Sequence, residues 1–290
     1  MPTHRIILNP AAGRGTAKKA IIEIEALLKG HGIDFDSVAT EQPGHGVELA
    51  QQAVTDGVEV IVSAGGDGTA NEIINGLMTL EPSERSKVAM GVLPVGTGND
   101  YAFGIHVPIE IEQACELLAA DNRKTIDVGR VFGGDFPEGR YFGNCIGIGF
   151  DAEVGFVAAN LSPLRGLLSY LVGVILTNFI YFKAPTLEVN YDDGAFTKPV
   201  LMCSIMNGTR LGGGFHMTPN AKTDDGQFDM CIADDVSRMR VLGLIPHFLK
   251  GTQAGEEEIH ILQGSSITVS AQNGSFGAHV DGETLCENGT

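Results

Sequence analysis

Hydrophobic residues follow two alternating patterns over the first 120 positions of the chain. Short apolar runs typical of buried strands occupy residues 5–9, 35–40, 58–65 and 88–94. Between them, apolar residues recur at helical spacing in residues 18–32, 47–54, 71–78 and 111–122, with Thr16 expected as the N-cap of the first helix. Strands that alternate with helices predict a largely parallel sheet with helices on its faces.

The pattern changes after about residue 125. Strand-like runs then dominate, at residues 125–132, 141–150, 186–191, 198–208 and 227–235, and a helix over 237–250 is followed by further strands at 258–271. We therefore predict an α/β chain with two domains. Residues 1–127 form a three-layer, parallel-sheet, nucleotide-binding domain, and residues 128–290 form a mostly β sandwich domain.

One apolar segment, residues 166–182, has no charged residue and is flanked by Arg165 and Lys183. As a helix it would extend about 25 Å, at the lower limit of a membrane span. Ser169, Thr177 and Asn178 weaken that interpretation, and no second span accompanies it. A buried or interfacial helix is the favoured prediction.

The formal net charge of -17 disfavours nucleic acid as a partner, because such binding depends on cationic contacts to phosphate. The start of the chain has too short an apolar stretch for a signal peptide, so we expect a cytoplasmic protein.

The cysteines are widely spaced and lack a CxxC motif, and we expect reduced core residues at Cys115, Cys145, Cys203, Cys231 and Cys286.

The stretch SAGGDGT, residues 63–69, follows a strand and opens a helix. Gly65, Gly66 and Gly68 would allow the main chain to approach a phosphate, Thr69 adds a hydroxyl, and Asp67 is suited to face Mg²⁺. The alternative is a glycine-rich turn in which Asp67 caps the helix. Two further loops, NPAAGRG at 9–15 and PVGTGND at 94–100, also follow strands, so three such loops would meet at one edge of the sheet.

Neither the Walker A pattern nor a GxGxxG motif follows a strand, which argues against a P-loop or a dinucleotide fold. The motifs instead resemble those of the bacterial diacylglycerol and lipid kinase family, kin to sphingosine kinases and more distantly to NAD kinases and phosphofructokinases. The resemblance is carried, in order along nearly the whole chain, by NPAAGRG, TEQPGHG from Thr40, GGDGTANE, PVGTGND, IGIGFDAEV, LGGGFHMTPNAKTDDGQFD and VDGE.

The resemblance implies ATP and Mg²⁺ as cofactors. With the loop glycines, the residues expected to surround ATP are Asn9, Thr40, Gly65, Gly66, Asp67, Gly68, Thr69, Asn71, Glu72, Gly96 and Thr97. Thr40 would lie on the adenosine side, and that expectation depends on the family alone.

The resemblance also suggests catalytic groups. Phosphoryl transfer needs a group that takes the proton from the acceptor hydroxyl, and Glu283 in the HVDGE stretch is the candidate general base, with a surface glutamate in a turn as the alternative. Asp67 would act through Mg²⁺. Asp100 and Asp127 are weaker second carboxylates that could equally be a helix cap and a strand-end residue.

In the second domain, NAKTDDGQFD resembles the family's structural Mg²⁺ loop. Its ligands would be the carboxylate of Asp225 and the main-chain oxygens of Lys222 and Gln227. An ordinary Asp-Gly turn is the alternative.

The leading hypothesis is an ATP-dependent kinase of a lipid hydroxyl, most simply that of diacylglycerol, acting at a membrane surface on the inner face. The apolar segment 161–187 would then line an acyl pocket, although core packing explains the same residues. A kinase of a soluble acceptor such as NAD, and a nucleotide- or lipid-sensing module without turnover, are the alternatives. A homodimer is left open by the sequence.

Overall fold

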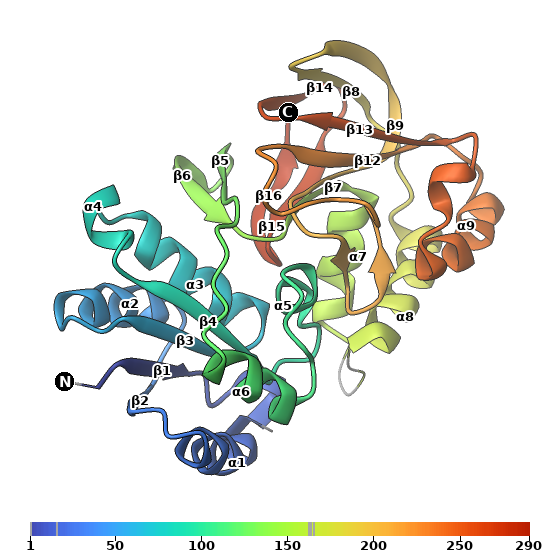
Figure 1. Cartoon of the computed structure of the whole chain (residues 1–290). Coiled ribbons are helices and arrows are strands. Elements are labelled where there is room, and N and C mark those ends of the chain that lie inside the picture. The colour runs from blue at the N-terminus through green and yellow to red at the C-terminus, as the bar shows by residue number, and fades with distance from the viewer. Residues whose placement is uncertain (1, 16, 162–163, 165) are drawn as a thin grey trace. The chain divides into compact units, whose positions relative to one another are not determined.

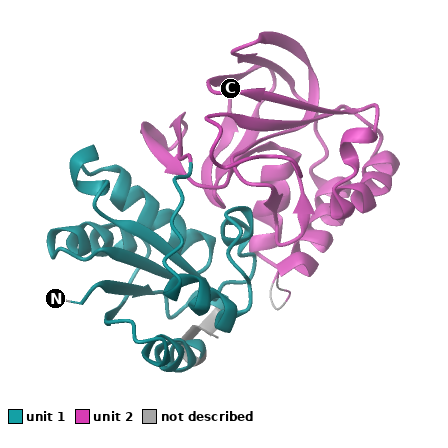
Figure 2. Ribbon diagram, in the orientation of Figure 1, with its two compact units in different colours: residues 1–126 teal, residues 127–290 magenta. Residues whose placement is uncertain are grey.

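The computed structural model describes residues 2–15, 17–161, 164 and 166–290, and Figure 1 shows the order of its elements. The chain forms two compact units, residues 1–126 and residues 127–290, which are coloured separately in Figure 2. Thr16, expected as an N-cap, lies outside the described residues, as does Arg165 at the start of the apolar segment.

The first unit is built on four parallel strands in the spatial order β2-β1-β3-β4. The strands are β1 (His4–Leu8), β2 (Phe35–Ala39), β3 (Val60–Gly65) and β4 (Ala89–Pro94). Every residue of β3 is buried, as expected for a central strand of a parallel sheet. The register pairs Leu8 with Ala39 on one side and with Ala64 on the other, so the carboxyl ends of these strands lie along one edge.

Helices cover both faces of this sheet because successive residues of a strand point to opposite faces. Ile6 of β1 belongs to a cluster with Leu28 and Cys115, and its neighbour Ile7 belongs to a second cluster with Ile73. The three-layer architecture is therefore confirmed. Its helices are α1 (Ala17–Gly30), α2 (His45–Thr55), α3 (Asp67–Met78), α4 (Pro82–Arg85), α5 (Asp100–Gly104) and α6 (Ile111–Ala119), with a 3₁₀ turn at Ala12–Gly15.

The second unit is an antiparallel β sandwich, as predicted. One layer has the order β13-β12-β9-β7-β15-β16, and the first half of the long strand β9 pairs instead with β8, which pairs with β14. Strand β9 therefore belongs to both layers. The strands of this sandwich are β7 (Cys145–Gly149), β8 (Thr186–Tyr191), β9 (Gly194–Met206), β12 (Phe228–Asp234), β13 (Ile259–Gly264), β14 (Ile267–Asn273), β15 (Phe276–Val280) and β16 (Glu283–Gly289).

Two antiparallel pairs accompany the sandwich. The first is the hairpin of β5 (Gly129–Gly133) and β6 (Phe136–Phe142), and the second joins β10 (Arg210–Leu211) to β11 (Phe215–His216). The strand predicted over 125–132 thus begins only at Gly129. Upstream of it, the N–H group of Asp127 donates to the carbonyl oxygen of Thr223, which is not part of a strand.

Three helices belong to this unit: α7 (Phe150–Ala159), α8 (Gly166–Ile180) and α9 (Arg238–Lys250). Helix α7 corrects the strand predicted over 141–150, which is divided by a turn at residues 143–144 and ends at Gly149. Helix α7 was missed because its FDAEVGFVAA sequence is apolar on several sides, so it has no clear helical period.

The apolar segment forms α8, with one face buried through Gly173, Val174 and Thr177. None of the helices in the described part of the chain has the length and apolar character that crossing a bilayer requires.

The cysteines are free thiols, four of them buried, and burial raises the pKa of Cys203 to about 12. These observations agree with the buried or interfacial helix and the reduced cysteines that the sequence predicts.

Candidate active site

The residues expected to surround ATP follow the carboxyl ends of four neighbouring parallel strands. Asn9 follows β1, Thr40 follows β2, Gly66 follows β3, and Thr97 lies three residues beyond β4. The N–H group of Thr40 still donates to the Leu8 carbonyl oxygen at 2.7 Å, which continues the sheet to this edge. Ligands of open parallel sheets bind at this edge.

Two of the glycine turns touch one another at this edge. A Cβ atom at Gly96 would overlap the main chain of Gly66, so the turn after β4 lies directly against the turn after β3. Asn99, left-handed with φ 53°, holds the second turn because its Oδ1 accepts the Gly96 N–H group at 3.0 Å. Sequence reasoning missed Asn99, although asparagine is the side chain that best tolerates this conformation.

The turn after β1 is joined to the same place. The Asn9 side-chain amide donates to Thr69 Oγ1 at 3.1 Å, and Asn9 Oδ1 accepts the N–H group of Ala11 at 3.0 Å. Thr69 is 3% exposed, and its side chain occupies the space that a Cβ atom at Gly65 would need. All three glycine-containing loops therefore meet at one edge of the sheet.

The first turn of α3 remains accessible at this edge. Gly68 is exposed, with open space where a side chain would project, and Thr97 is also exposed. The first N–H groups of a helix have no partner within the helix, and together with the helix dipole they favour an anion. The arrangement can therefore hold a phosphate group.

Asn71 and Glu72 have other contacts. Asn71 is 1% exposed, and its Oδ1 accepts from the Asn75 amide inside α3 at 3.0 Å. The two carboxylate oxygens of Glu72 accept the N–H groups of Gly44 and Gly46, each at 2.8 Å, at the start of α2. Glu72 thus supports the start of α2, which is a role that the sequence did not suggest, whereas the Asn71 contact lies within its own helix.

Asp67 and Asp100 approach the same point. A Cβ atom at Gly98 would lie 3.0 Å from Asp67 Oδ2 and 3.3 Å from Asp100 Oδ2. Asp67 Oδ1 is oriented by the N–H group of Tyr101, at 2.8 Å, and Asp100 is 5% exposed. Two carboxylates side by side repel one another unless a cation or a proton lies between them, so the pair fits a divalent cation.

Magnesium bound with a nucleotide uses one or two carboxylates together with phosphate oxygens. Asp67 and Asp100 match that donor set. No group of three His, Cys, Asp or Glu side chains in the described residues could hold a metal by itself. That absence is compatible with a cation that needs the phosphates as its further ligands.

Asp127 lies in the second unit, at the predicted structural metal loop. Its Oδ2 accepts the N–H group of Gly226 at 2.8 Å, and Asp225 Oδ1 accepts that of Gln227 at 3.1 Å. The carboxylates of Asp127 and Asp225 and the main-chain oxygens of the loop, including that of Lys222, supply the hard oxygen donors that Mg²⁺ prefers. The oxygen atoms of this loop fit a cation. Asp127 lies beside the loop and is bonded to it through Gly226.

A buried carboxyl group lies close to this loop. Burial is the main cause that raises the pKa of Asp229, and the nearby charge of Asp225 raises it further, while the hydrogen bond from Gln263 lowers it. A nearby cation would favour the charged form of Asp229.

Glu283 begins β16 and forms an ion pair. Its Oε1 accepts from Arg140 Nη2 at 2.7 Å, and the side chain remains 38% exposed. An arginine partner favours the ionised carboxylate, which is the form that can accept a proton. The sequence did not identify Arg140, which lies 143 positions earlier and belongs to the β5–β6 hairpin.

The turn before Glu283 is held from the neighbouring loop. Asp281, left-handed with φ 46°, accepts three main-chain N–H groups through its carboxylate. Its Oδ2 accepts from Gly143 at 2.8 Å, and its Oδ1 accepts from Asn144 at 3.0 Å and from Cys145 at 2.8 Å. The VDGE turn is therefore anchored in the sandwich.

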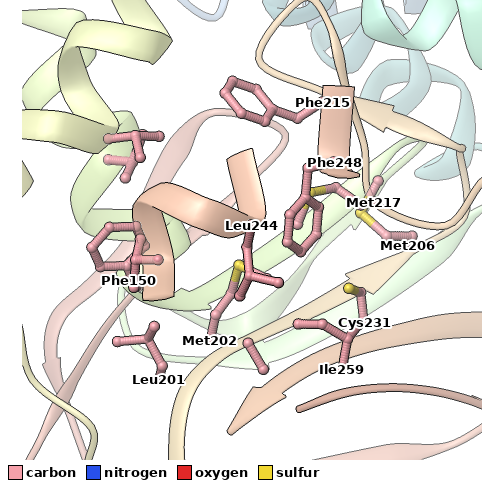
Figure 3. Packing of buried hydrophobic residues seen from close by; sticks show 14 of the residues in the cluster. Phe150, Leu201, Met202, Met206, Phe215, Met217, Cys231, Leu244, Phe248 and Ile259 are labelled. Atoms are coloured by element: carbon pink, nitrogen blue, oxygen red, sulfur yellow. The ribbon is translucent and has the colours of Figure 1, made fainter. Parts of the chain in front are cut away.

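An apolar cavity of about 80 Å³ lies in the second unit, between the sheet and helices α7, α8 and α9. Figure 3 shows the surrounding cluster, in which Leu244 and Phe248 of α9 and Met202 of the sheet take part. Tyr170 and Val174 of α8 also line the cavity. Since a cavity of about 150 Å³ holds one benzene ring, this space accommodates about three groups the size of a methylene.

Comparison with protein families places both units. Residues 3–131 match the family described as "Diacylglycerol kinase catalytic domain", and residues 144–290 match the family described as "YegS C-terminal NAD kinase beta sandwich-like domain". The boundary between the two matches falls in the β5–β6 hairpin.

Curated relatives match along almost the whole chain. The protein named diacylglycerol kinase of Bacillus subtilis (strain 168) is 27% identical over 293 residues, covering 98% of this chain and 93% of the relative. The protein of that name from Staphylococcus saprophyticus is 26% identical over 280 residues, covering 96% of this chain and 88% of the relative.

Solved structures show the same fold. A crystal structure of a diacylglycerol kinase from Bacillus anthracis str. Sterne aligns with TM-score 0.71 at 22% identity, covering 98% of this chain and 90% of that one. A second structure from the same strain aligns with TM-score 0.79 at 24% identity, covering 99% and 90% of the two chains.

The contact between Gly96 and Gly66 leads to a testable prediction. Gly96→Ala forces the two turns apart, and we expect it to lower the free energy of unfolding by about 1–3 kcal/mol. MgATP binding, measured by calorimetry, should weaken with it. Gly68→Ala is the matched control, because that position is open and in a helix, where alanine is favoured, so stability should be kept or raised. Equal stability and ATP affinity of wild type and Gly96→Ala would contradict this assignment.

Proposed function

The chain belongs to the diacylglycerol kinase family, and we propose that it transfers the γ-phosphate of ATP to a lipid hydroxyl, with diacylglycerol as the first candidate acceptor and phosphatidic acid as its product. The observation that carries this proposal is the meeting of three glycine-containing loops at the carboxyl edge of the parallel sheet, beside the open first turn of α3. The relatives' printed names support the acceptor.

The phosphates would lie at the open first turn of α3, beside the touching turns of Gly66 and Gly96. Asn9 and Thr97 would then border the nucleotide, with Thr40 toward the adenosine. Glycine at these positions matters because the main chain itself must approach the phosphate oxygens. Positioning and charge neutralisation provide most of the catalysis in phosphoryl transfer.

Asp67 and Asp100 are the residues that would hold Mg²⁺ with the nucleotide. When bound, the ion would neutralise negative charge on the phosphate oxygens. In the second unit, Asp225 with the main-chain oxygens of Lys222 and Gln227 would hold a structural Mg²⁺, and Asp127 would fix the same loop through Gly226.

Glu283 is the proposed general base. Its carboxylate would take the proton of the acceptor hydroxyl as the oxygen attacks the γ-phosphorus, while the bond from that phosphorus to the bridging oxygen breaks and ADP leaves. Arg140 donates to this carboxylate and restricts its rotation. Asp281 fixes the main chain of the turn.

The apolar cavity under α8 is the proposed acyl site. Its walls come from the cluster of Val174, Met202 and Leu244, and its volume suits part of one acyl chain. A longer chain would have to displace side chains of α8 and α9, because protein interiors are closely packed. If these residues serve core packing alone, a change in the cavity should not affect which acceptor the protein uses.

The opposite face of α8 favours contact with a membrane surface. Leu168, Ile175 and Phe179 are 55%, 45% and 53% exposed, and they recur seven and four residues apart, so they form one outward stripe. Exposed Arg238 lies over the ring of Phe182 at the end of the same segment. An apolar stripe with a nearby cation suits shallow insertion among lipid head groups.

The proposed function is tested by labelled-phosphate transfer from ATP to a panel of acceptors. The panel comprises dioctanoylglycerol, dioleoylglycerol, phosphatidylglycerol, a sphingoid base, an isoprenoid alcohol and NAD. We expect labelled phosphatidic acid from the diacylglycerols. Transfer to NAD alone would identify a soluble-acceptor kinase, and ATP binding without any transfer would indicate a sensing module.

Ala233→Leu is an arm of the same experiment, because Ala233 is 3% exposed and lines the cavity. The larger side chain should raise KM for dioleoylglycerol several-fold and leave KM for ATP unchanged. Ala195→Leu, the same change at an exposed position of β9, is the control. Identical kinetics of both variants would remove the cavity from acceptor binding.

Glu283→Ala should lower kcat by about 10²- to 10⁴-fold, the usual contribution of a general base. Glu287→Ala, on an exposed position of the same strand, should leave kcat unchanged. Thermal unfolding of both variants controls for loss of the Arg140 ion pair. Wild-type turnover in a folded Glu283→Ala protein would exclude this residue as the base.

The outward stripe of α8 is tested by co-sedimentation with vesicles of phosphatidylcholine and phosphatidylglycerol. The double variant Ile175→Ser with Phe179→Ser should bind roughly tenfold more weakly, because two large apolar side chains lose their burial. Ile22→Ser, at a 74% exposed position of α1, is the control. Equal binding by all three proteins would refute the membrane-contact role of α8.

A further inference from the structure

A buried polar cluster lies beside the VDGE turn, and the proposed chemistry does not use it. The cluster consists of His279 on β15, Asp151 in the first turn of α7 and Ser204 on β9, which are 4%, 7% and 0% exposed. The hydroxyl of Ser204 donates to Asp151 Oδ2. His279 Nε2 lies 3.6 Å from Asp151 Oδ1.

Strand register explains how these side chains meet. His279 is paired with Gly147 of β7, and Gly147 is paired with Ser204 on its other side. A Cβ atom at Gly147 would overlap His279 Nε2 and would lie 2.6 Å from Asp151 Oδ2. The missing side chain in the middle strand therefore gives the histidine and the carboxylate room to meet over the sheet.

The other ring nitrogen of His279 faces the VDGE turn. The N–H group of Gly282 donates to His279 Nδ1 at 3.4 Å, so Nδ1 must be the unprotonated acceptor. In the neutral ring the proton is then on Nε2, which is the nitrogen that faces Asp151. The carboxylate of Asp151, 3.6 Å from Nε2, lies where it favours the tautomer that can hold Gly282, the residue immediately before Glu283.

The location of His279 beside Asp151 and the VDGE turn argues against a role in stability alone. A buried ionisable pair is often no more stabilising than apolar side chains of similar size, because both groups lose their hydration. The turn is already anchored on one side through Asp281. His279 supplies a second anchor at the next residue, which restricts the direction in which the turn presents Glu283.

We propose that His279, oriented by Asp151, is a positioning residue that fixes the VDGE turn so that the Glu283 carboxylate meets the acceptor hydroxyl. This inference rests on the proposed function, since it assigns a support to the proposed base. Asp151 also lines the apolar cavity, where among the described lining residues it is the one charged side chain. The residue that orients His279 is therefore also part of the wall of the proposed acyl site.

The test compares two variants of His279 in which a side-chain amide replaces one of the two ring nitrogens. In His279→Asn the amide oxygen can replace Nδ1 as acceptor for Gly282, whereas in His279→Gln the amide reaches the Nε2 position and contacts Asp151 alone. We expect His279→Gln to lower kcat tenfold or more with KM for ATP and diacylglycerol within twofold of wild type. His279→Asn should retain kcat within about threefold.

The matched control is His260, whose Nε2 lies 2.9 Å from Asp234 Oδ2 elsewhere in the sandwich. His260→Gln should leave kcat unchanged, which separates positioning from the general loss of a histidine–aspartate contact. Equal loss of kcat in His279→Asn and His279→Gln, or wild-type kcat in His279→Gln, would overturn the proposal.

A measurement on the unsubstituted protein covers the case in which the variants do not fold. Nitrogen-15 NMR of the histidine rings should show Nδ1 of His279 without a proton, and a proton on Nδ1 would overturn the inference. This result does not depend on activity. Wild-type turnover in Glu283→Ala would instead refute the proposed base and leave the tautomer result standing, so the two failures are distinguishable.

Discussion

The contact between the main chains of Gly66 and Gly96 is the constraint on which the sheet edge of the first unit depends. Because neither residue has a side chain, two turns from adjacent strands can lie against each other and leave the first turn of α3 open. Asn99 keeps the second turn in place by accepting the Gly96 N–H group. A side chain at Gly96 would separate the turns and displace the main-chain N–H groups that an anion needs.

Carboxylates that accept main-chain N–H groups provide a second principle, shared by both units. Glu72 binds the start of α2, Asp127 binds Gly226, and Asp281 binds the turn before Cys145. Charge-assisted bonds of this kind are stronger than neutral ones and point in defined directions. Part of the acidic excess of this chain therefore fixes loops rather than covering the surface.

The residues of the candidate site were predictable to the extent that they lie next to one another in sequence. Gly65, Gly66 and Thr69 belong to one stretch, and their placement after a buried strand follows from the hydrophobic pattern. Arg140 and Asn99 could not be identified in that way. The ion pair of Arg140 with Glu283 joins positions far apart in the chain, and the role of Asn99 depends on a positive φ that several residue types can adopt.

The sequence by itself determined the alternation of strands and helices, the parallel sheet of the first unit and the β sandwich of the second, because apolar periodicity and glycine turns are local properties. Tertiary structure decided that α7 is a helix, that Glu72 serves α2, and that Asp127 belongs to the loop of Asp225. It also decided that His279 and Asp151 meet over Gly147. These outcomes depend on strand register and on the packing of distant segments, neither of which is written in any single stretch of the chain.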